Sequence, residues 1–238
     1  MTRLVVNGCS YMDSYARGQG HEDLAQQLGL SSSRSLAIPG SCNNRIIRTT
    51  LKDSYQTQEK TLYIVGLTFL RRTELSVAPT NDPFEGRWIS FQNMVNPQHR
   101  YADHWTLDYT RAFLDIKLRA DLFGLEDLLE QLMYQLLSLI GDLTHRGHQI
   151  LIFRNPQEEY YNILDSEKFK NLQNCVNIVD ALQWEAIPWQ VAQGIEFHTN
   201  DAHLPQGLRH PAPGQHGHLN TFLVEYINQH ALHLPILS

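Results

Sequence analysis

The chain has 238 residues and a formal net charge of −6, with 42% hydrophobic and 18% charged residues. This apolar fraction is enough for one sizeable core and excludes a disordered chain. The acidic balance argues against binding nucleic acid by phosphate neutralisation, and no apolar run approaches the ~18 residues of a membrane span. Three distant cysteines make no disulfide framework. Because no signal-like segment opens the chain, we expect a cytoplasmic protein.

Short apolar runs alternate with helical patterns in the first third of the chain. Residues 4–6 form a short β-branched run, and residues 35–38 form a second strand-like run. The clearest strand lies at 61–67, where nearly every residue is apolar, as expected for a strand buried on both faces of a sheet. Helical spacing between these runs, at about 24–30 and 43–55, predicts a parallel sheet covered by helices.

The middle of the chain interrupts this alternation. Residues 71–106 are rich in proline, asparagine and aromatic residues, and we expect a long loop insertion there, a form that binding loops often take. A long helical region at about 107–145 follows, with leucines at helical spacing, and then a strand at 149–153. A further strand is predicted at 176–179 and a closing helix at 219–231.

The order of these elements predicts a single domain over residues 1–238, with a flavodoxin-like α/β fold of about five parallel strands between two layers of helices. In such open sheets, ligands bind at the carboxyl ends of the strands. Polar loops follow three strands at 7–13, 39–45 and 68–74, and a histidine-rich segment at 196–218 precedes the last helix. Together they offer a hydroxyl, backbone amides, side-chain amides and an imidazole, which are the groups that acyl transfer needs.

These loops resemble the motifs of the SGNH (GDSL-like) hydrolase superfamily, in its divergent branch found in phage and bacterial genomes. Residues 8–10, Gly-Cys-Ser, match the first block, with cysteine where aspartate is usual. Residues 40–46 resemble the second block in its Gly-x-x-Asn-x-Arg-Ile form, and His210-Pro211 matches the last block. Gly207 stands where the last block has its aspartate, and the third block, Gly-x-Asn-Asp, is absent.

The resemblance implies a serine-dependent hydrolase that cleaves an ester, such as an O-acyl group on a carbohydrate or small molecule. Ser10 would attack the acyl carbon, His210 would take its proton, and Asp201 would orient the imidazole. The backbone amides of Ser10 and Gly40 and the side chain of Asn43 would hold the oxyanion. No cofactor and no metal are implied.

Two assignments stay open within this hypothesis. The group that orients His210 is Asp201, Glu196 or a backbone carbonyl. Asn43 supplies an oxyanion donor, or else Asn43 or Asn44 is the N-cap of the helix that follows, and the two roles are compatible.

Other polar and aromatic residues are expected to bind the substrate. Adjacent arginines can hold a carboxylate or phosphate through bidentate contacts, although their sequence favours a surface ion pair with Glu74. Arg45 and Arg48, one turn apart, are expected on a solvated helix face. Aromatic residues in the long loop stack on a sugar ring or simply pack that loop. The expected substrate-binding residues are Thr68, Arg71, Arg72 and Trp105.

Other functions explain the same features. A non-catalytic protein could bind a glycan or another ligand in the same pocket, and the histidines of 196–218 could hold zinc or copper, although no supporting ligand motif is present. Ser10 is otherwise an ordinary turn residue, and Gly8 and Gly40 otherwise permit a positive φ. The expected partner is a small-molecule or carbohydrate ester, with no nucleic acid and no membrane; the oligomeric state is undetermined by the sequence.

Overall fold

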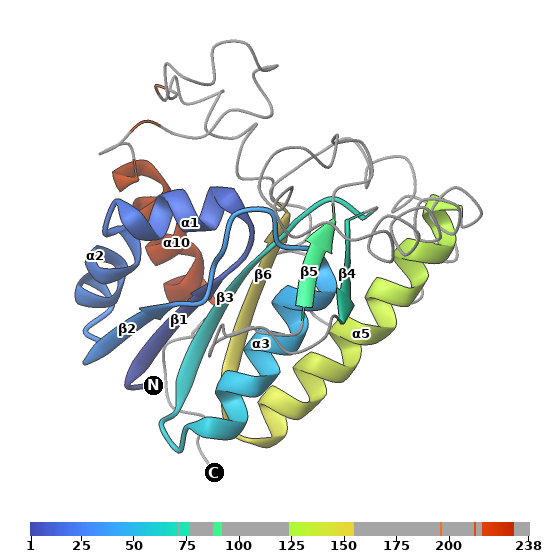
Figure 1. Ribbon diagram of the computed structural model, residues 1–238. Coiled ribbons are helices and arrows are strands. Elements are labelled where there is room, and N and C mark those ends of the chain that lie inside the picture. Colours follow the sequence, from blue (N-terminus) through green and yellow to red (C-terminus); the bar gives the residue numbers. More distant parts are fainter. Residues whose placement is uncertain are drawn as a thin grey trace.

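A parallel sheet between two layers of helices forms the body of the molecule (Figure 1). The computed structural model describes residues 1–70, 72–76, 88–91, 124–154, 196, 212 and 216–230. The predicted strand at 176–179 lies outside these residues, as does the first part of the helical region predicted at 107–145.

Four parallel strands make up the sheet in the described part of the chain, in the spatial order β2-β1-β3-β6. They are β1 (Arg3–Asn7), β2 (Ser32–Ser35), β3 (Thr61–Leu67) and β6 (Gln149–Arg154). Because β1 pairs with β2 on one side and β3 on the other, the chain changes direction across the sheet after β2. The switch point therefore lies between β1 and β3. This arrangement confirms the predicted α/β class.

Helices cover both faces of the sheet (Figure 1). They are α1 (Ser10–Arg17), α2 (Gly20–Gln27) and α10 (Gly217–Gln229) on one face, and α3 (Asn43–Gln56) and α5 (Leu125–His145) on the other. The alternation of side chains along β1 explains both layers, since Leu4 and Val6 pack with α1, α2 and α10, whereas Val5 packs with α3 and α5. A strand whose side chains pack into a core on both faces of the sheet is apolar at nearly every position.

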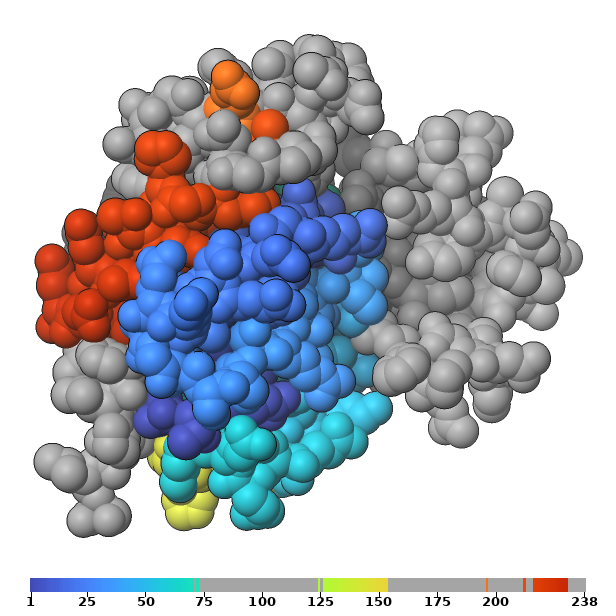
Figure 2. All heavy atoms as spheres, turned by 90° about the vertical axis from the view of Figure 1, so that its left-hand side faces the viewer, coloured from blue at the N-terminus to red at the C-terminus, as the bar shows by residue number. Residues whose placement is uncertain are grey.

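The last described helix lies beside the first two, as Figure 2 shows. The Tyr15 hydroxyl on α1 lies 2.7 Å from Asn220 Oδ1 on α10 and 2.8 Å from the Gly20 carbonyl oxygen. The Asn220 Nδ2 group also donates to that carbonyl, at 3.0 Å. This buried network joins segments that are 205 positions apart, so the end of the chain helps to hold the helix that starts at Ser10.

The α5 helix buries the leucine-rich stripe that the sequence predicts. The buried residues of the stripe are Leu129, Leu132, Met133, Leu136, Leu139 and Leu143. Gly147, with φ +74°, follows the helix and turns the chain into β6. None of the described helices combines the length and hydropathy needed to cross a membrane.

Two predicted element boundaries are wrong. β2 spans Ser32–Ser35 rather than 35–38, because its pairing with β1 begins where Ser32 stands opposite Arg3. The segment predicted as a loop at 7–13 is helical from Ser10 onward. Both errors fall where a polar sequence adopts regular structure, which apolar periodicity does not detect.

The predicted loop insertion at 71–106 contains regular backbone structure. β4 (Thr73–Ser76) and β5 (Trp88–Phe91) pair in antiparallel fashion and form a separate two-stranded sheet. It lies on the side of the main sheet that carries α3 and α5 (Figure 1).

His148 is a buried histidine between α5 and β6. Its Nδ1 accepts a hydrogen bond from the Thr61 amide at 3.2 Å, which requires that nitrogen to be unprotonated. Burial lowers the pKa of His148, and the positive charges of Lys60 and Arg146 act in the same direction. A histidine whose pKa is lower in the folded than in the unfolded protein stabilises the fold above its unfolded pKa. That contribution is lost as the pH falls from the unfolded pKa towards the folded pKa.

We therefore expect the free energy of unfolding to fall as the pH drops from about 7.5 to 5, through the ordinary histidine pKa of about 6.5. His148→Asn should show a smaller fall, since an amide oxygen can replace Nδ1 as acceptor and does not titrate. Urea unfolding over this pH range measures the effect, with His218→Asn on the exposed side of α10 as control. Equal pH dependence in wild type and His148→Asn would contradict this account.

Candidate functional site

The switch point gathers predicted site residues at the carboxyl edge of the sheet. Asn7 at the end of β1 stands opposite Val65 of β3, so the loops that follow these neighbouring strands begin side by side. Ser10 follows β1 and Thr68 follows β3 directly. Asn43, at the start of α3, contacts Thr68. The structure therefore brings Asn43 and Thr68, two of the predicted site residues, into contact.

Ser10 is the first residue of α1 and is half-buried. Only Gly8 and Cys9 separate it from β1, and the N-cap residue Cys9 is extended, with φ −90° and ψ −157°. A strand, a short turn and a helix thus carry the hydroxyl to the edge of the sheet. The helix N-terminus favours negative charge near this position, because its first amides have no partner within the helix.

The turn before Ser10 requires glycine for reasons of space. A Cβ on Gly8 would lie 3.0 Å from the Gly66 carbonyl oxygen of β3 and would clash with the Met12 side chain. Gly8 is not among the residues with positive φ, so the suggestion of a positive φ there is wrong. Gly40 does have a positive φ, +79°, as suggested for it. The first turn is therefore packed against β3, whereas the second depends on backbone conformation.

The side chain of Asn7 fixes the first loop, a role that the sequence analysis missed. Asn7 is fully buried, and its Oδ1 accepts from the Gly8 amide at 2.8 Å. Its Nδ2 lies 2.9 Å from the Ile46 carbonyl oxygen and from the hydroxyls of Thr49 and Thr50 on α3. An asparagine that ends a buried apolar strand was the available signal, since a buried amide needs several polar partners.

Asn43 joins the second and third loops. Its Nδ2 donates to the Thr68 carbonyl at 3.1 Å, and its Oδ1 accepts from the Thr68 amide at 2.8 Å. The side chain is only 4% exposed. The N-cap of α3 is Cys42, whose Sγ accepts from the Arg45 amide at 3.4 Å, so the suggestion that Asn43 or Asn44 is the cap is wrong.

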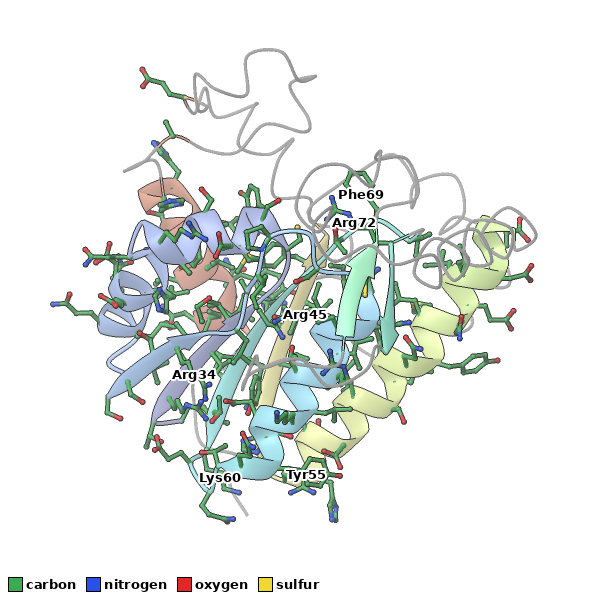
Figure 3. The ribbon with its side chains drawn as sticks, viewed as in Figure 1. Arg34, Arg45, Tyr55, Lys60, Phe69 and Arg72 are labelled. Carbon is green, nitrogen blue, oxygen red and sulfur yellow. The ribbon has the colours of Figure 1, made fainter. Side chains whose placement is uncertain are left out.

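Arg72 lies at the edge of the third loop (Figure 3). Its Nη1 donates to the Thr68 hydroxyl at 2.7 Å and lies 3.5 Å from the Ser41 carbonyl oxygen. The guanidinium carbon is 4.7 Å from the centre of the Phe69 ring. No carboxylate among the side chains that the structure describes forms an ion pair with Arg72. The guanidinium therefore brings positive charge to the site while bonding to neutral groups.

Arg45 is buried, which corrects the expected solvated helix face. It is 4% exposed, and its Nη1 donates to the Leu36 carbonyl at 3.2 Å and to the Ser41 hydroxyl at 3.1 Å. The long side chain reaches back past the start of α3 to the second loop. The Ile38 amide of that loop donates to the Gly8 carbonyl at 3.3 Å. The loops that follow β1, β2 and β3 are thus joined to one another by hydrogen bonds.

Four predicted site residues lie outside the described residues: Arg71, Trp105, Asp201 and His210. Glu196 is described and exposed, and its carbonyl oxygen accepts from the Ala212 amide at 2.9 Å. Within the described ranges, no three His, Cys, Asp or Glu side chains gather as a metal site. Of the C-terminal histidines, His216 is buried, with its ring edge-on to Tyr15 at 5.3 Å between centroids.

Comparisons with known proteins bear on the fold. No protein-family model and no curated protein matches the sequence. The esterase EstA from Pseudoalteromonas sp., in a structure inhibited by monoethylphosphonate, is similar with a TM-score of 0.51 and 10% identity, over 97% of this chain and 99% of that one. TesA (TM-score 0.49, 14% identity, 95% and 98% coverage) and a GDSL-like lipase from Bacteroides thetaiotaomicron (0.40, 13%, 96% and 89%) are also similar. The likeness to EstA shows that the two proteins share a fold, the predicted α/β arrangement of a parallel sheet between helices.

From the contact between Asn43 and Thr68, we predict that removing the Asn43 side chain lowers the stability of the fold. Asn43→Ala should lower the free energy of unfolding by about 1–3 kcal/mol, because it leaves the Thr68 peptide groups without their buried partner. Asn44→Ala is the matched control, since Asn44 is the next residue of α3 and is exposed. Urea unfolding compares the two variants, and equal effects would show that the Asn43 amide contributes nothing specific.

Proposed function

We propose that this protein is a serine-dependent hydrolase that cleaves an ester, such as an O-acyl group on a carbohydrate or small molecule. The observation that carries the proposal is the position of Ser10, at the start of α1 and at the switch point of the sheet. The fold is also that of an esterase, EstA. Ligands of open α/β sheets bind at such switch points.

The proposed reaction follows the usual course of serine catalysis. The Ser10 Oγ attacks the acyl carbon while His210 takes its proton, and Asp201 orients the imidazole. The carbonyl oxygen becomes an oxyanion, and its collapse expels the alcohol, which receives the proton from His210. Water then attacks the acyl-enzyme by the same route, which releases the acid and restores Ser10.

The described loops support the proposed oxyanion donors. The amides of Ser10 and Gly40, with the side chain of Asn43, would stabilise the negative charge. The hydrogen bond from Ile38 to Gly8 joins the loops that carry Ser10 and Gly40. Asn43 is held at the N-terminus of α3, where the helix dipole also favours negative charge. Such donors act best when they are fixed before the charge develops.

Thr68, Arg71, Arg72 and Trp105 are the proposed substrate-binding residues. Arg72 is the one for which the structure gives the strongest support, since its half-buried guanidinium has no carboxylate partner among the described side chains. A guanidinium in that situation pairs readily with a carboxylate or phosphate on a ligand.

Ser10→Ala should abolish hydrolysis of 4-nitrophenyl acetate, with kcat reduced by at least about 10³, because the nucleophile is lost. A fluorophosphonate probe should label the wild-type protein at Ser10 and leave Ser10→Ala unlabelled. Ser14→Ala is the matched control, since Ser14 lies one turn further along α1 and is also half-buried. His210→Ala and Asp201→Asn should also lower kcat while the protein stays folded.

Unchanged turnover by Ser10→Ala would end the hydrolase proposal. Saturable binding of an unmodified sugar, with no labelling and no turnover by the wild-type protein, would support instead a non-catalytic glycan-binding protein on the same fold.

Arg72→Gln should discriminate between substrates by charge. We expect the KM for an ester with an anionic acyl group, 4-nitrophenyl hemisuccinate, to rise about tenfold, whereas the KM for 4-nitrophenyl acetate changes little, because only the first pairs with the guanidinium. Arg17→Gln is the control, as Arg17 is an exposed arginine at the end of α1. An equal loss with both esters would mean that Arg72 only supports Thr68.

A further inference from the structure

A cavity of about 510 Å³ lies between the edge strand β2 and helix α3; we call it the α3 cavity. Residues 34–38 form one wall and one side of α3 forms the other. None of Ser10, Gly40, Asn43, Thr68 and Arg72 lines it, although it borders the candidate site through Arg45 and residues 36–38. Its volume is that of a site for a small molecule.

The polar sequence of β2 explains why this space is empty of side chains. Arg34 stands opposite Val5 in the sheet, and Val5 in turn stands opposite Tyr63. Val5 and Tyr63 pack in the core beneath α3 and α5. Arg34 occupies the corresponding position at the edge of the described sheet, but its side chain is 52% exposed and ends in a charged group. The principal contacts of α3 are with α5, β3 and β4, which leaves the β2 edge open on this face.

Positive charge dominates the α3 cavity. Three cationic side chains, from Arg34, Arg45 and Lys52, line it together with one carboxylate, that of Asp53. Without Arg45, which is buried, Arg34 and Lys52 at the cavity and Arg3 behind Asp53 outnumber that carboxylate by two positive charges, although the whole chain carries −6. Figure 3 shows Arg34 beside β2 and Arg45 nearer the carboxyl edge of the sheet. A local concentration of cations in an acidic protein favours an anionic ligand.

The single carboxylate already pairs with two arginines, Arg3 behind the cavity and Arg34 on its wall. Asp53 Oδ1 accepts from Arg3 at 2.8 Å and from Arg34 at 3.1 Å, and its Oδ2 accepts from the Tyr63 hydroxyl at 2.9 Å. Burial raises the pKa of Tyr63, and the Asp53 carboxylate raises it further, so the hydroxyl remains a donor. Asp53 is 4% exposed, and both oxygens of its carboxylate accept hydrogen bonds from these partners.

The remaining walls combine a free cation with an apolar surface. Lys52 is exposed and makes no hydrogen bond or ion pair within the part of the chain that the structure describes. Across the cavity, Leu36 and Ile38 provide apolar surface, and Ile38 is one of three large hydrophobic residues exposed in the described part of the chain, at 42%. A ligand that fits both walls carries an anionic group and a carbon skeleton.

We propose that the α3 cavity is a second ligand site, which binds a small organic phosphate. The phosphate would lie between Arg34 and Lys52, and the organic group would lie against Ile38. A phosphate monoester dianion matches the excess of two positive charges, whereas a carboxylate leaves one unpaired. This proposal is independent of the esterase proposal, because neither of the two cations that would hold the phosphate belongs to the candidate site.

The test is a titration of the full chain with phenyl phosphate at constant ionic strength, followed by calorimetry and by backbone amide shifts. We expect saturable binding of one equivalent, with shifts concentrated at residues 34–38 and 52–56. Lys52→Gln should weaken binding about tenfold. Arg17→Gln removes the same charge from the helix layer on the other face of the sheet, and it should bind as the wild type does.

Ile38→Glu tests the same cavity from its other wall, without touching the Asp53 network, and should abolish binding. The proposal is overturned if Lys52→Gln and Ile38→Glu bind phenyl phosphate like wild type, or if Arg72→Gln is the variant that loses it. Benzoate bound as tightly as phenyl phosphate would also overturn it. Ser10→Ala should bind phenyl phosphate unchanged, so failure of the esterase proposal and failure of this one are distinguishable.

Discussion

The arrangement of the site depends on two buried asparagine side chains that bond to the backbone of other elements. Asn7 joins the end of β1 to α3, and Asn43 joins the start of α3 to the residue after β3. A buried peptide group without a partner costs about 1–3 kcal/mol, so each contact also satisfies groups that the fold would otherwise leave unpaired. These amides fix the ends of β1 and β3 relative to the start of α3.

Arginine side chains extend this network through neutral acceptors, and Arg72 does so with no carboxylate partner among the described side chains. Arg45 and Arg72 donate to carbonyl and hydroxyl oxygens of the loops, which are neutral acceptors. Positive potential therefore remains at the carboxyl edge of the sheet, where it can attract anionic ligands. Beside the α3 cavity, Lys52 adds a further positive charge, and Arg34 pairs with Asp53. Four of the described cations, those of Arg34, Arg45, Lys52 and Arg72, thus lie on α3 or near it.

Part of the candidate site could be predicted from the sequence because its signals are local. The position of Ser10 after the first strand, and of Gly40 in a tight turn, follow from short patterns of apolar and turn residues. The burial of Arg45 could not be predicted in this way, because it depends on which side of α3 faces the second loop. The pairing of Asn43 with Thr68 was likewise hidden, since it spans 25 positions and involves backbone atoms that every residue has.

The sequence by itself determined the α/β class and the buried strands, because apolar periodicity and turn residues act over a few positions. Only the tertiary structure decided the strand order β2-β1-β3-β6, the contacts that bind three loops into one unit, and the cavity beside α3. Those features arise where strand pairing brings distant segments together. Hydrogen bonds and empty space between such segments depend on three-dimensional position, which no local pattern encodes.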